Sequence, residues 1–151
     1  MSKLFGGVTV ALVALTLGSG LAMAGGDESI TARKACMKSH GAGMGVMVPM
    51  FKGEKPYDTA TVKATLETMG TACDGWATFW PEDSKTSTTQ KTHAAETIWT
   101  DKAGFEAAGN TYYNAEQALL ATKDEAGFKA AFPALGAACG ACHKVFRTAM
   151  E

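Results

Sequence analysis

The sequence lacks an excess of charge of either sign, because 14 Lys and Arg residues face 15 Asp and Glu residues for a net charge of −1. A chain with this balance carries no electrostatic sign of nucleic-acid binding. It also lacks the alternation of apolar and polar residues that marks a half-buried strand. No carboxylate pair and no nucleophile beside a base stands out, so we expect a protein that is not an enzyme.

Long hydrophobic runs are absent beyond the N-terminus. There, one basic residue precedes an apolar run from about Val8 to Leu17, and the small-x-small sequence AMA follows, ending at Ala24. This order is typical of a secretory signal peptide. The alternative is a membrane anchor, but the run is short and interrupted by glycine. We therefore expect residues 1–24 to be cleaved and residues 25–151 to form one domain in the periplasm.

Four stretches of the remaining chain have the apolar spacing of amphipathic helices. They cover roughly residues 29–51, 58–80, 96–122 and 124–146. Ser29 is a candidate N-cap of the first stretch and Asp58 of the second, and the fourth stretch starts at Asp124. Four such helices joined mostly by short loops predict an all-α antiparallel four-helix bundle. Bundles of this kind hold cofactors in their core, between facing helices.

Near the C-terminus the sequence AACGACHKVF contains Cys139 and Cys142, followed directly by His143. Three kinds of chemistry use such a pair of cysteines. A redox dithiol of the thioredoxin type needs a βαβ context, which a chain without strands does not provide. A structural zinc site needs four ligands, and Cys36 and His40 could complete it. That arrangement leaves His143 without a role, in a protein expected to be exported.

The third chemistry is the covalent attachment of haem c, for which C-x-x-C-H is the sequence pattern. Two thiols three residues apart form thioether bonds to the two vinyl groups of one porphyrin, and the next residue presents an imidazole to the iron. Because Cys139 and Cys142 lie on the apolar stripe of the fourth helix, the cofactor is expected inside the bundle. The sequence favours one covalent haem c with His143 as the proximal ligand. Arg147 follows one turn later on the same face, near the imidazole, unless it is a solvated surface cation.

Several segments together give the chain a resemblance to a known family. They are RKACMKSHGAGM, KGEKPYD, WATFWPEDS, ETIWTDKAGF and, late in the chain, CGACHKVFR. In these segments the chain resembles the class II c-type cytochromes, which include cytochromes c′ and the cytochrome c-556 group. The resemblance covers essentially all of residues 25–151 and implies a four-helix bundle with haem between the helices. For many members it also implies a homodimer formed through the first helices.

The resemblance also implies roles for two residues of the first helix. It places Met37 opposite His143 on the other side of the iron, and Arg33 beside a haem propionate. In c-556-like members a methionine sulfur ligates the iron and the protein transfers electrons, here with redox partner proteins that the sequence does not identify. In cytochromes c′ the side chain at this position stays unbound, and the iron takes nitric oxide or another small gas. Met37 permits both, and its surroundings look more like c-556; His40 competes as a ligand only if the helix is rotated.

Cys36 and Cys73 lie outside the haem motif. They are equally far along the chain from the centre of the turn at residues 52–57, so an antiparallel hairpin brings them to the same height on adjacent helices. In an oxidising compartment this arrangement predicts a disulfide, which would also fix the backbone next to Met37. Two buried free thiols, or a bridge between the subunits of a dimer, are the alternatives.

Overall fold

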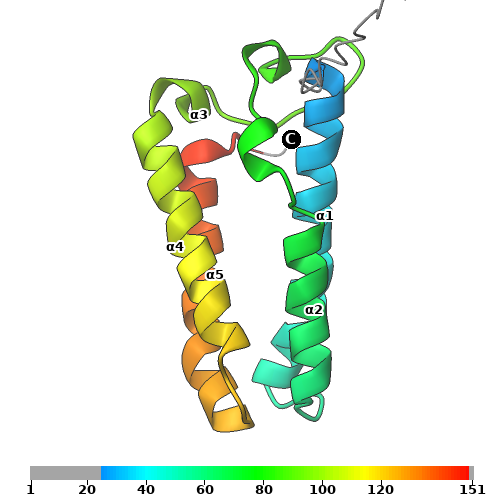
Figure 1. Cartoon of the computed structure of the whole chain (residues 1–151), viewed down its shortest axis with the longest axis vertical. Helices are drawn as coiled ribbons and strands as arrows, with labels where there is room; N and C mark the ends of the chain where they lie inside the picture. The colour runs from blue at the N-terminus through cyan, green and yellow to red at the C-terminus, as the bar shows by residue number, and fades with distance from the viewer. Residues whose placement is uncertain (1–24, 150–151) are drawn as a thin grey trace, which may run out of the picture.

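The computed structural model describes residues 25–149, which fold into a bundle of helices (Figure 1). The four long helices are α1 (Gly26–Phe51), α2 (Thr59–Thr71), α4 (Lys102–Leu120) and α5 (Glu125–Phe146). The connection between α2 and α4 holds the 3₁₀ turns η1 (Trp76–Thr78) and η2 (Glu82–Ser84) and the short helix α3 (Thr97–Thr100). The predicted four-helix bundle is therefore confirmed. Within residues 25–149 no helix is long and apolar enough to cross a membrane, and the expected signal peptide lies outside this range.

The bundle consists of two helical hairpins, because α1 packs mainly on α2 and α4 packs mainly on α5 (Figure 1). The two hairpins meet through contacts of α2 with α4 and of α1 with α5. Gly43 allows α1 to approach α2 closely, since a Cβ atom at this position would overlap the side chain of Met69. The helices α1 and α5, which carry the candidate ligands, therefore contact each other where the two hairpins meet.

The apolar core is divided into two clusters. One, here called the turn-end cluster, lies near the tight turns of both hairpins and contains Met47, Met50, Val62, Leu66, Met69, Leu119, Phe128, Phe132 and Leu135. The other, here called the α3-end cluster, contains Ile98, Trp99 and Phe146, with Trp80, Ala94, Phe105, Ala108 and Cys142 packed against it. The two clusters share no residue, so the part of the bundle between them is built from other side chains.

Side-chain caps account for the starts of α2 and α5, as they do for α4 below. The Asp58 carboxylate accepts hydrogen bonds from the N–H groups of Ala60 (2.9 Å) and Thr61 (3.3 Å), as its candidate role predicted. The Asp124 carboxylate likewise accepts from the N–H of Gly127 at 2.8 Å. The predicted cap at Ser29 is wrong. The first helix begins earlier, after Gly25, and Ser29 is fully buried in its first turn.

Two predicted helices are shorter or less continuous than their apolar spacing suggested. The second ends at Thr71, and a left-handed turn at Gly75 (φ 81°) then redirects the chain. Trp80 therefore lies in the long connection and not on a helix. The third stretch is broken at Asp101, whose carboxylate caps α4 by accepting from the N–H of Gly104 at 3.0 Å. A Cβ atom at Gly104 would overlap this carboxylate, so the cap requires glycine there.

Candidate functional site

The C-x-x-C-H residues lie in the last two turns of α5. Cys139, Cys142 and His143 are all half-buried, and neither thiol is part of a disulfide. Cys142 packs against the α3-end cluster. Cys139, one turn earlier, faces the part of α4 that carries Glu116, whose charge contributes to its electrostatic environment. The three residues therefore lie together between the two apolar clusters, where the sequence placed a cofactor.

The electrostatics of this group favour uncharged side chains. Burial raises the pKa of the Cys139 thiol, and the charge of Glu116 raises it further. Burial and the neighbouring Cys139 raise the pKa of Cys142. Burial and then the charge of Arg147 lower the pKa of His143. A neutral imidazole is the form of histidine that binds a metal, so the lowered pKa is compatible with the predicted ligand role of His143.

Met37 lies on α1, one turn before His40 and next to the disulfide-bonded Cys36. Its side chain is half-buried, and it belongs to neither of the two apolar clusters formed by the described residues. The other methionines of this helix differ, because Met47 and Met50 are core members and Met44 packs against them. A long thioether side chain that lies on a bundle helix without joining its core is free to contact a cofactor.

Arg33, one turn before Met37, is only 4% exposed. Its Nη1 donates to the Phe79 carbonyl (3.3 Å) and to Ser84 Oγ (2.9 Å), and its Nη2 donates to the Ser84 carbonyl (2.6 Å) and Thr92 Oγ1 (2.8 Å). Burial lowers its pKa to about 10, so it remains charged at neutral pH. No ion pair joins it to a carboxylate of residues 25–149. Arg33 thus fastens the long connection to α1 and brings a buried, uncompensated positive charge to this end of the bundle.

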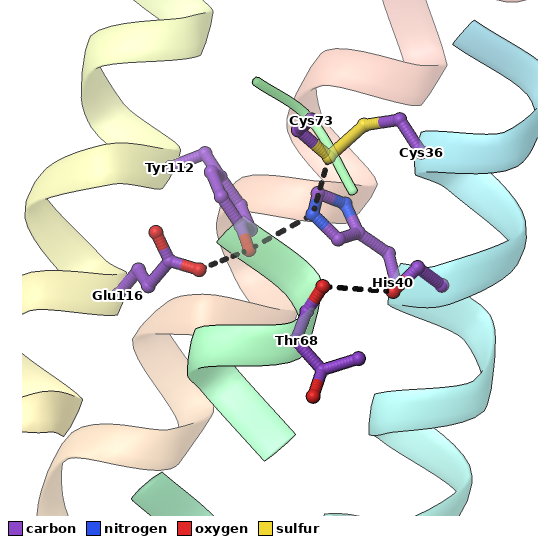
Figure 2. The surroundings of a disulfide bond; sticks show 7 residues. Cys36, His40, Thr68, Cys73, Tyr112 and Glu116 are labelled. Atoms are coloured by element: carbon purple, nitrogen blue, oxygen red, sulfur yellow. Dashed lines mark hydrogen bonds between the residues drawn. A yellow bond between two sulfur atoms is a disulfide. The ribbon is translucent and has the colours of Figure 1, made fainter. Parts of the chain in front are cut away.

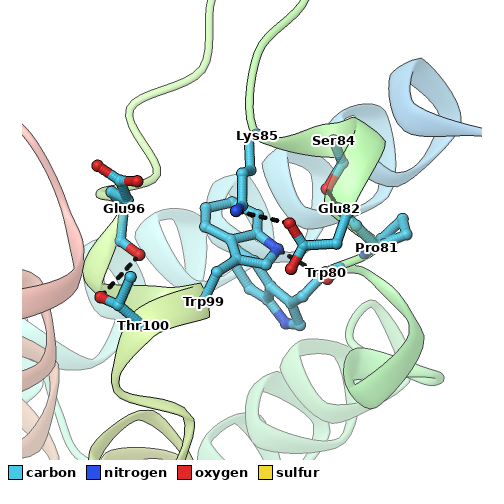
Figure 3. A network of polar contacts seen from close by, with 8 residues as sticks. All are labelled: Trp80, Pro81, Glu82, Ser84, Lys85, Glu96, Trp99 and Thr100. Atoms are coloured by element: carbon cyan, nitrogen blue, oxygen red, sulfur yellow. Dashed lines mark hydrogen bonds and ion pairs between the residues drawn. The ribbon is translucent and has the colours of Figure 1, made fainter.

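Two tryptophans of the α3-end cluster lie against Arg33. Its guanidinium carbon is 5.1 Å from the ring centroid of Trp80 and 5.9 Å from that of Trp99. Figure 3 shows the two indoles crossing, with Lys85 above Trp99 and paired with Glu82 at 2.6 Å. Trp99 Nε1 donates to the Trp80 carbonyl at 2.9 Å. This cluster therefore combines aromatic surface with cationic groups.

A polar network occupies the middle of the bundle, beside the disulfide (Figure 2). The Tyr112 hydroxyl donates to Glu116 Oε1 at 2.9 Å and lies 3.3 Å from Nε2 of His40, whose ring stacks on the tyrosine. Because the hydroxyl gives its one hydrogen to Glu116, it accepts from His40, and Nε2 carries the imidazole hydrogen. His40 Nε2 is also 3.2 Å from Cys73 Sγ. The network therefore links α1 and α4 to Cys73, at the start of the connection that follows α2.

Burial of this network shifts the ionisation of its members. Burial raises the pKa of Glu116, which is only 6% exposed, although the bond from Tyr112 opposes that shift. Burial, and then the nearby charge of Glu116, raises the pKa of Tyr112. Burial, and then His143, lowers the pKa of His40. His40 thus faces the interior, against Tyr112, without any rotation of the helix.

Cys36 and Cys73 are joined by a disulfide, with an S–S distance of 2.04 Å and a Cα–Cα distance of 4.8 Å. The pairing is the one that the hairpin geometry predicts. Cys36 is fully buried in α1, whereas Cys73 lies just after the end of α2. Because these sulfurs are bonded to each other, the grouping of Cys36, Cys73 and His40 has no free thiolate to offer a metal ion.

The prediction that Arg147 continues the helical face of His143 is wrong. The helix ends at Phe146, and Arg147 has an extended backbone that forms an antiparallel bridge with Ala94. The Ala95 N–H donates to the Phe146 carbonyl at 3.0 Å, so this end of α5 is tied to the segment before α3. The Arg147 side chain is exposed, and its charge acts on His143 as described above.

The residues present fit a covalently attached haem. Two free thiols and a neutral imidazole lie three and four residues apart on one helix, in the spacing that haem c attachment uses. An uncompensated arginine lies at the adjacent end of the bundle, suited to the carboxylates of such a group. One indole nitrogen there, Trp80 Nε1, is buried and has no hydrogen-bond partner among the described residues.

Comparison with known proteins identifies the family. The sequence profile of the family described as cytochrome c′ matches residues 28–147. Cytochrome c-556 of Agrobacterium fabrum is 34% identical over 142 residues, which are 93% of this chain and 93% of that protein. Cytochrome c′ of Alcaligenes xylosoxydans is 30% identical over 80% of this chain and 94% of that protein. This chain belongs to the cytochrome c′ family, whose members carry a single covalently attached haem c.

Solved structures agree with this assignment. Cytochrome c′ from Rubrivivax gelatinosus superimposes with a TM-score of 0.74 at 26% identity, over 82% of this chain and 97% of that chain. A ferrous variant of cytochrome c prime from Alcaligenes xylosoxidans with bound nitric oxide gives a TM-score of 0.72 at 28% identity, over 84% and 98% of the two chains. The haem c cofactor and the bundle fold predicted from the sequence are therefore confirmed.

Sequence reasoning did not find Glu116 or the acceptors of Arg33. Glu116 stands four residues after Tyr112 and three before Leu119, so it occupies a core-facing position of α4. The sequence signal that could have found Glu116 is a carboxylate at a helical position where the spacing predicts an apolar side chain. Ser84 and Thr92 lie in a polar connection with no periodicity, and nothing in their spacing marked them as partners of a buried arginine.

Proposed function

We propose that this protein is an exported one-electron carrier of the c-556 type. In this proposal Cys139 and Cys142 bind the haem covalently, His143 is the proximal iron ligand and Met37 is the distal one. The bound haem supplies an iron that gains or loses one electron. A carrier of this kind only passes electrons between its partner proteins, so the proposed function is not enzymatic. Export to the periplasm after cleavage at Ala24 belongs to the same proposal, since haem c is attached outside the cytoplasm.

The observation that carries the proposal is the state of Met37. This side chain lies on a core helix but joins neither apolar cluster, although other methionines of α1 do. The disulfide at the neighbouring Cys36 fixes its backbone from the α2 side. Methionine paired with histidine favours reduced iron and raises the reduction potential, which suits an electron carrier. Relatives named cytochrome c-556 also support this choice.

The other residues have supporting roles in the proposal. The Cys139 and Cys142 sulfurs hold the macrocycle, and the neutral imidazole of His143 presents a nitrogen to the iron. The aromatic α3-end cluster excludes water from one side of the site, which raises the potential further. Arg33 supplies a positive charge for a haem propionate. Arg147, exposed at the end of α5, sets the charge near His143.

A competing function is the binding of nitric oxide or another small gas at five-coordinate iron. The neighbours titled as nitric oxide complexes of cytochrome c prime favour this alternative. It requires Met37 to remain unbound beside the iron. The two functions therefore differ in one bond, between the Met37 sulfur and the iron.

Replacement of Met37 by alanine in the haem-loaded protein tests that bond. We expect the oxidised wild type to be low-spin with a methionine-to-iron charge-transfer band, and Met37→Ala to lose the band and become high-spin. Met44→Ala is the matched control, because Met44 lies on the same helix but packs against the turn-end cluster. A spectrum that Met37→Ala leaves unchanged would show that Met37 is not a ligand, and a high-spin wild type would support the gas-binding function.

The proposed export has a separate test. We expect the protein recovered from the periplasm of a host that matures c-type cytochromes to begin at Gly25 and to carry the mass of one haem. Intact-mass spectrometry measures both features together. Retention of residues 1–24 would contradict the proposed cleavage without affecting the proposed ligands. Dimer formation through α1 stays a prediction, which the mass in solution tests.

A further inference from the structure

One buried polar atom in this structure has nothing to bond. Trp80 Nε1 is shielded from solvent, and residues 25–149 place no acceptor within reach of it. Buried N–H groups in folded proteins are almost always paired, because an unpaired one loses its hydration without compensation. A donor in this state at a site that takes a cofactor indicates an acceptor supplied by that cofactor.

The second tryptophan of the pair provides an internal comparison. Trp99 Nε1 donates to the Trp80 backbone carbonyl at 2.9 Å, so the same indole donor is satisfied a few ångströms away (Figure 3). The ring centroids of the two side chains are 6.2 Å apart, in an edge-to-face arrangement. The local fold therefore provides an acceptor for one indole and leaves the other open within the same aromatic cluster.

The charge beside Trp80 defines the chemistry of the missing acceptor. Arg33 lies over the Trp80 ring, and four of its five N–H groups are used on neutral oxygens of Phe79, Ser84 and Thr92. Glu82, in the η2 turn that also holds Ser84, is paired with Lys85. A buried cation without an anion and a buried N–H without an acceptor are both satisfied by one carboxylate.

Trp80 lies in the same cluster as the attachment motif and beside the expected propionate-binding cation. Its side chain packs against the α3-end cluster, which Cys142 of the motif also contacts. Haem c carries two propionate carboxylates on the edge of the macrocycle opposite the thioether bonds, and Arg33, which lies over the Trp80 ring, is the residue expected to bind one of them. We propose that the Trp80 indole N–H donates a hydrogen bond to one haem propionate, in a site whose positive charge comes from Arg33. This inference rests on the proposed attachment through Cys139 and Cys142, but it does not depend on which residue is the sixth ligand.

Trp80→Phe in the haem-loaded protein removes the donor and keeps an aromatic ring. We expect the propionate bending band in the resonance Raman spectrum to shift. We also expect the midpoint potential to fall, because the propionate charge is then less neutralised and stabilises oxidised iron. Trp76→Phe is the matched control, since Trp76 contacts Trp80 edge-on in the same aromatic group. It should leave the propionate band in place, and both variants should retain the covalent haem.

A measurement on the wild type covers the case in which the variant does not fold. In the ¹⁵N-labelled holoprotein, reduced and saturated with carbon monoxide so that the iron is diamagnetic whichever residue is the sixth ligand, we expect the Trp80 indole N–H to exchange slowly with solvent and to resonate downfield of the Trp76 indole. Rapid exchange, or a propionate band that Trp80→Phe and Trp76→Phe leave equally unchanged, would overturn the proposal. Failure of Met37 ligation would instead appear in the spin state, which the propionate band does not report.

Discussion

Arg33 contributes both to the candidate haem site and to the packing of the connection between α2 and α4. The family resemblance assigned it only to a haem propionate, whereas the structure gives it a second task. Its guanidinium bonds three residues of the connection between α2 and α4, and it stacks on two indoles of that region. The polar connection therefore depends on a charged side chain of α1 for its position.

Replacement of Arg33 by methionine tests this role in the fold. The change leaves the Phe79 and Ser84 carbonyls and the Thr92 hydroxyl without their donor, in surroundings that exclude water. We expect the free energy of unfolding to fall by about 2–4 kcal/mol, as for the loss of a buried hydrogen-bond network.

Amide exchange in residues 79–92 should also accelerate in the Arg33→Met variant. Urea unfolding with hydrogen-exchange mass spectrometry measures both effects, and Lys34→Met, at an exposed neighbouring position, is the control. Equal stability of the two variants would show that Arg33 does not hold the connection in place.

Glu116 predicts a specific dependence of stability on pH. Its pKa is raised in the folded protein, so the folded state binds more protons than the unfolded state above the ordinary carboxyl value. The contribution of this group to the free energy of unfolding therefore falls as pH rises from that ordinary value through the raised one. Glu116→Gln keeps an acceptor for Tyr112 but removes the titration.

The measurement is the difference in unfolding free energy between the Glu116→Gln variant and the wild type across acidic to neutral pH. We expect the variant to gain stability relative to the wild type as pH rises through this window. Tyr112→Phe, which removes the donor and keeps the carboxylate, should retain a pH-dependent difference from Glu116→Gln. A constant difference between wild type and Glu116→Gln would show that the carboxyl group titrates normally.

At the scale of elements, apolar spacing located the helices but misjudged two of their ends. The steps of four and three residues continue past Thr71 through Cys73, Trp76 and Trp80, although the chain there forms turns. Side chains in consecutive tight turns can also point inward at such intervals, so periodicity alone does not distinguish them from a helix. The informative residues were Gly75, which adopts a positive φ, and Asp101, which caps a new helix.

The disulfide acts at this scale because it joins α1 to the chain that follows α2. It closes a loop with a sequence separation of 37, for which the chain-entropy model gives about 3–4 kcal/mol. We expect the double variant Cys36→Ser/Cys73→Ser to lose a stabilisation of this order, or less if the oxidised state is strained. Urea unfolding of the holoprotein measures it. Chemical reduction of the wild type should lower the unfolding midpoint in the same direction, and an unchanged midpoint in both experiments would contradict the proposed contribution.

At the scale of the whole molecule, the division of the core explains where the cofactor belongs. The turn-end cluster closes one end of the bundle and the α3-end cluster closes the other, and the attachment motif lies between them. The sequence predicted the bundle and the haem motif, because helical spacing and C-x-x-C-H are local patterns. It also predicted the disulfide pair, from the symmetry of one hairpin.

Features that depend on contacts between distant segments were not predictable in this way. The bond of Tyr112 to His40 spans 72 residues, and the bonds of Arg33 to the connection span 46 to 59. Nothing local in the sequence selects these partners. The extended conformation of Arg147 has a similar origin, because its backbone pairs with Ala94 instead of continuing α5.

The proposed electron-carrier function requires Met37 and His143 to ligate the iron from opposite sides. Electron paramagnetic resonance of the oxidised, haem-loaded wild type in frozen solution measures the spin state that this ligation sets. Six-coordinate iron with methionine and histidine ligands predicts a rhombic low-spin signal with no high-spin component at neutral pH. A dominant axial high-spin signal would contradict the claim, because it would mean that the Met37 sulfur is not bound to the iron.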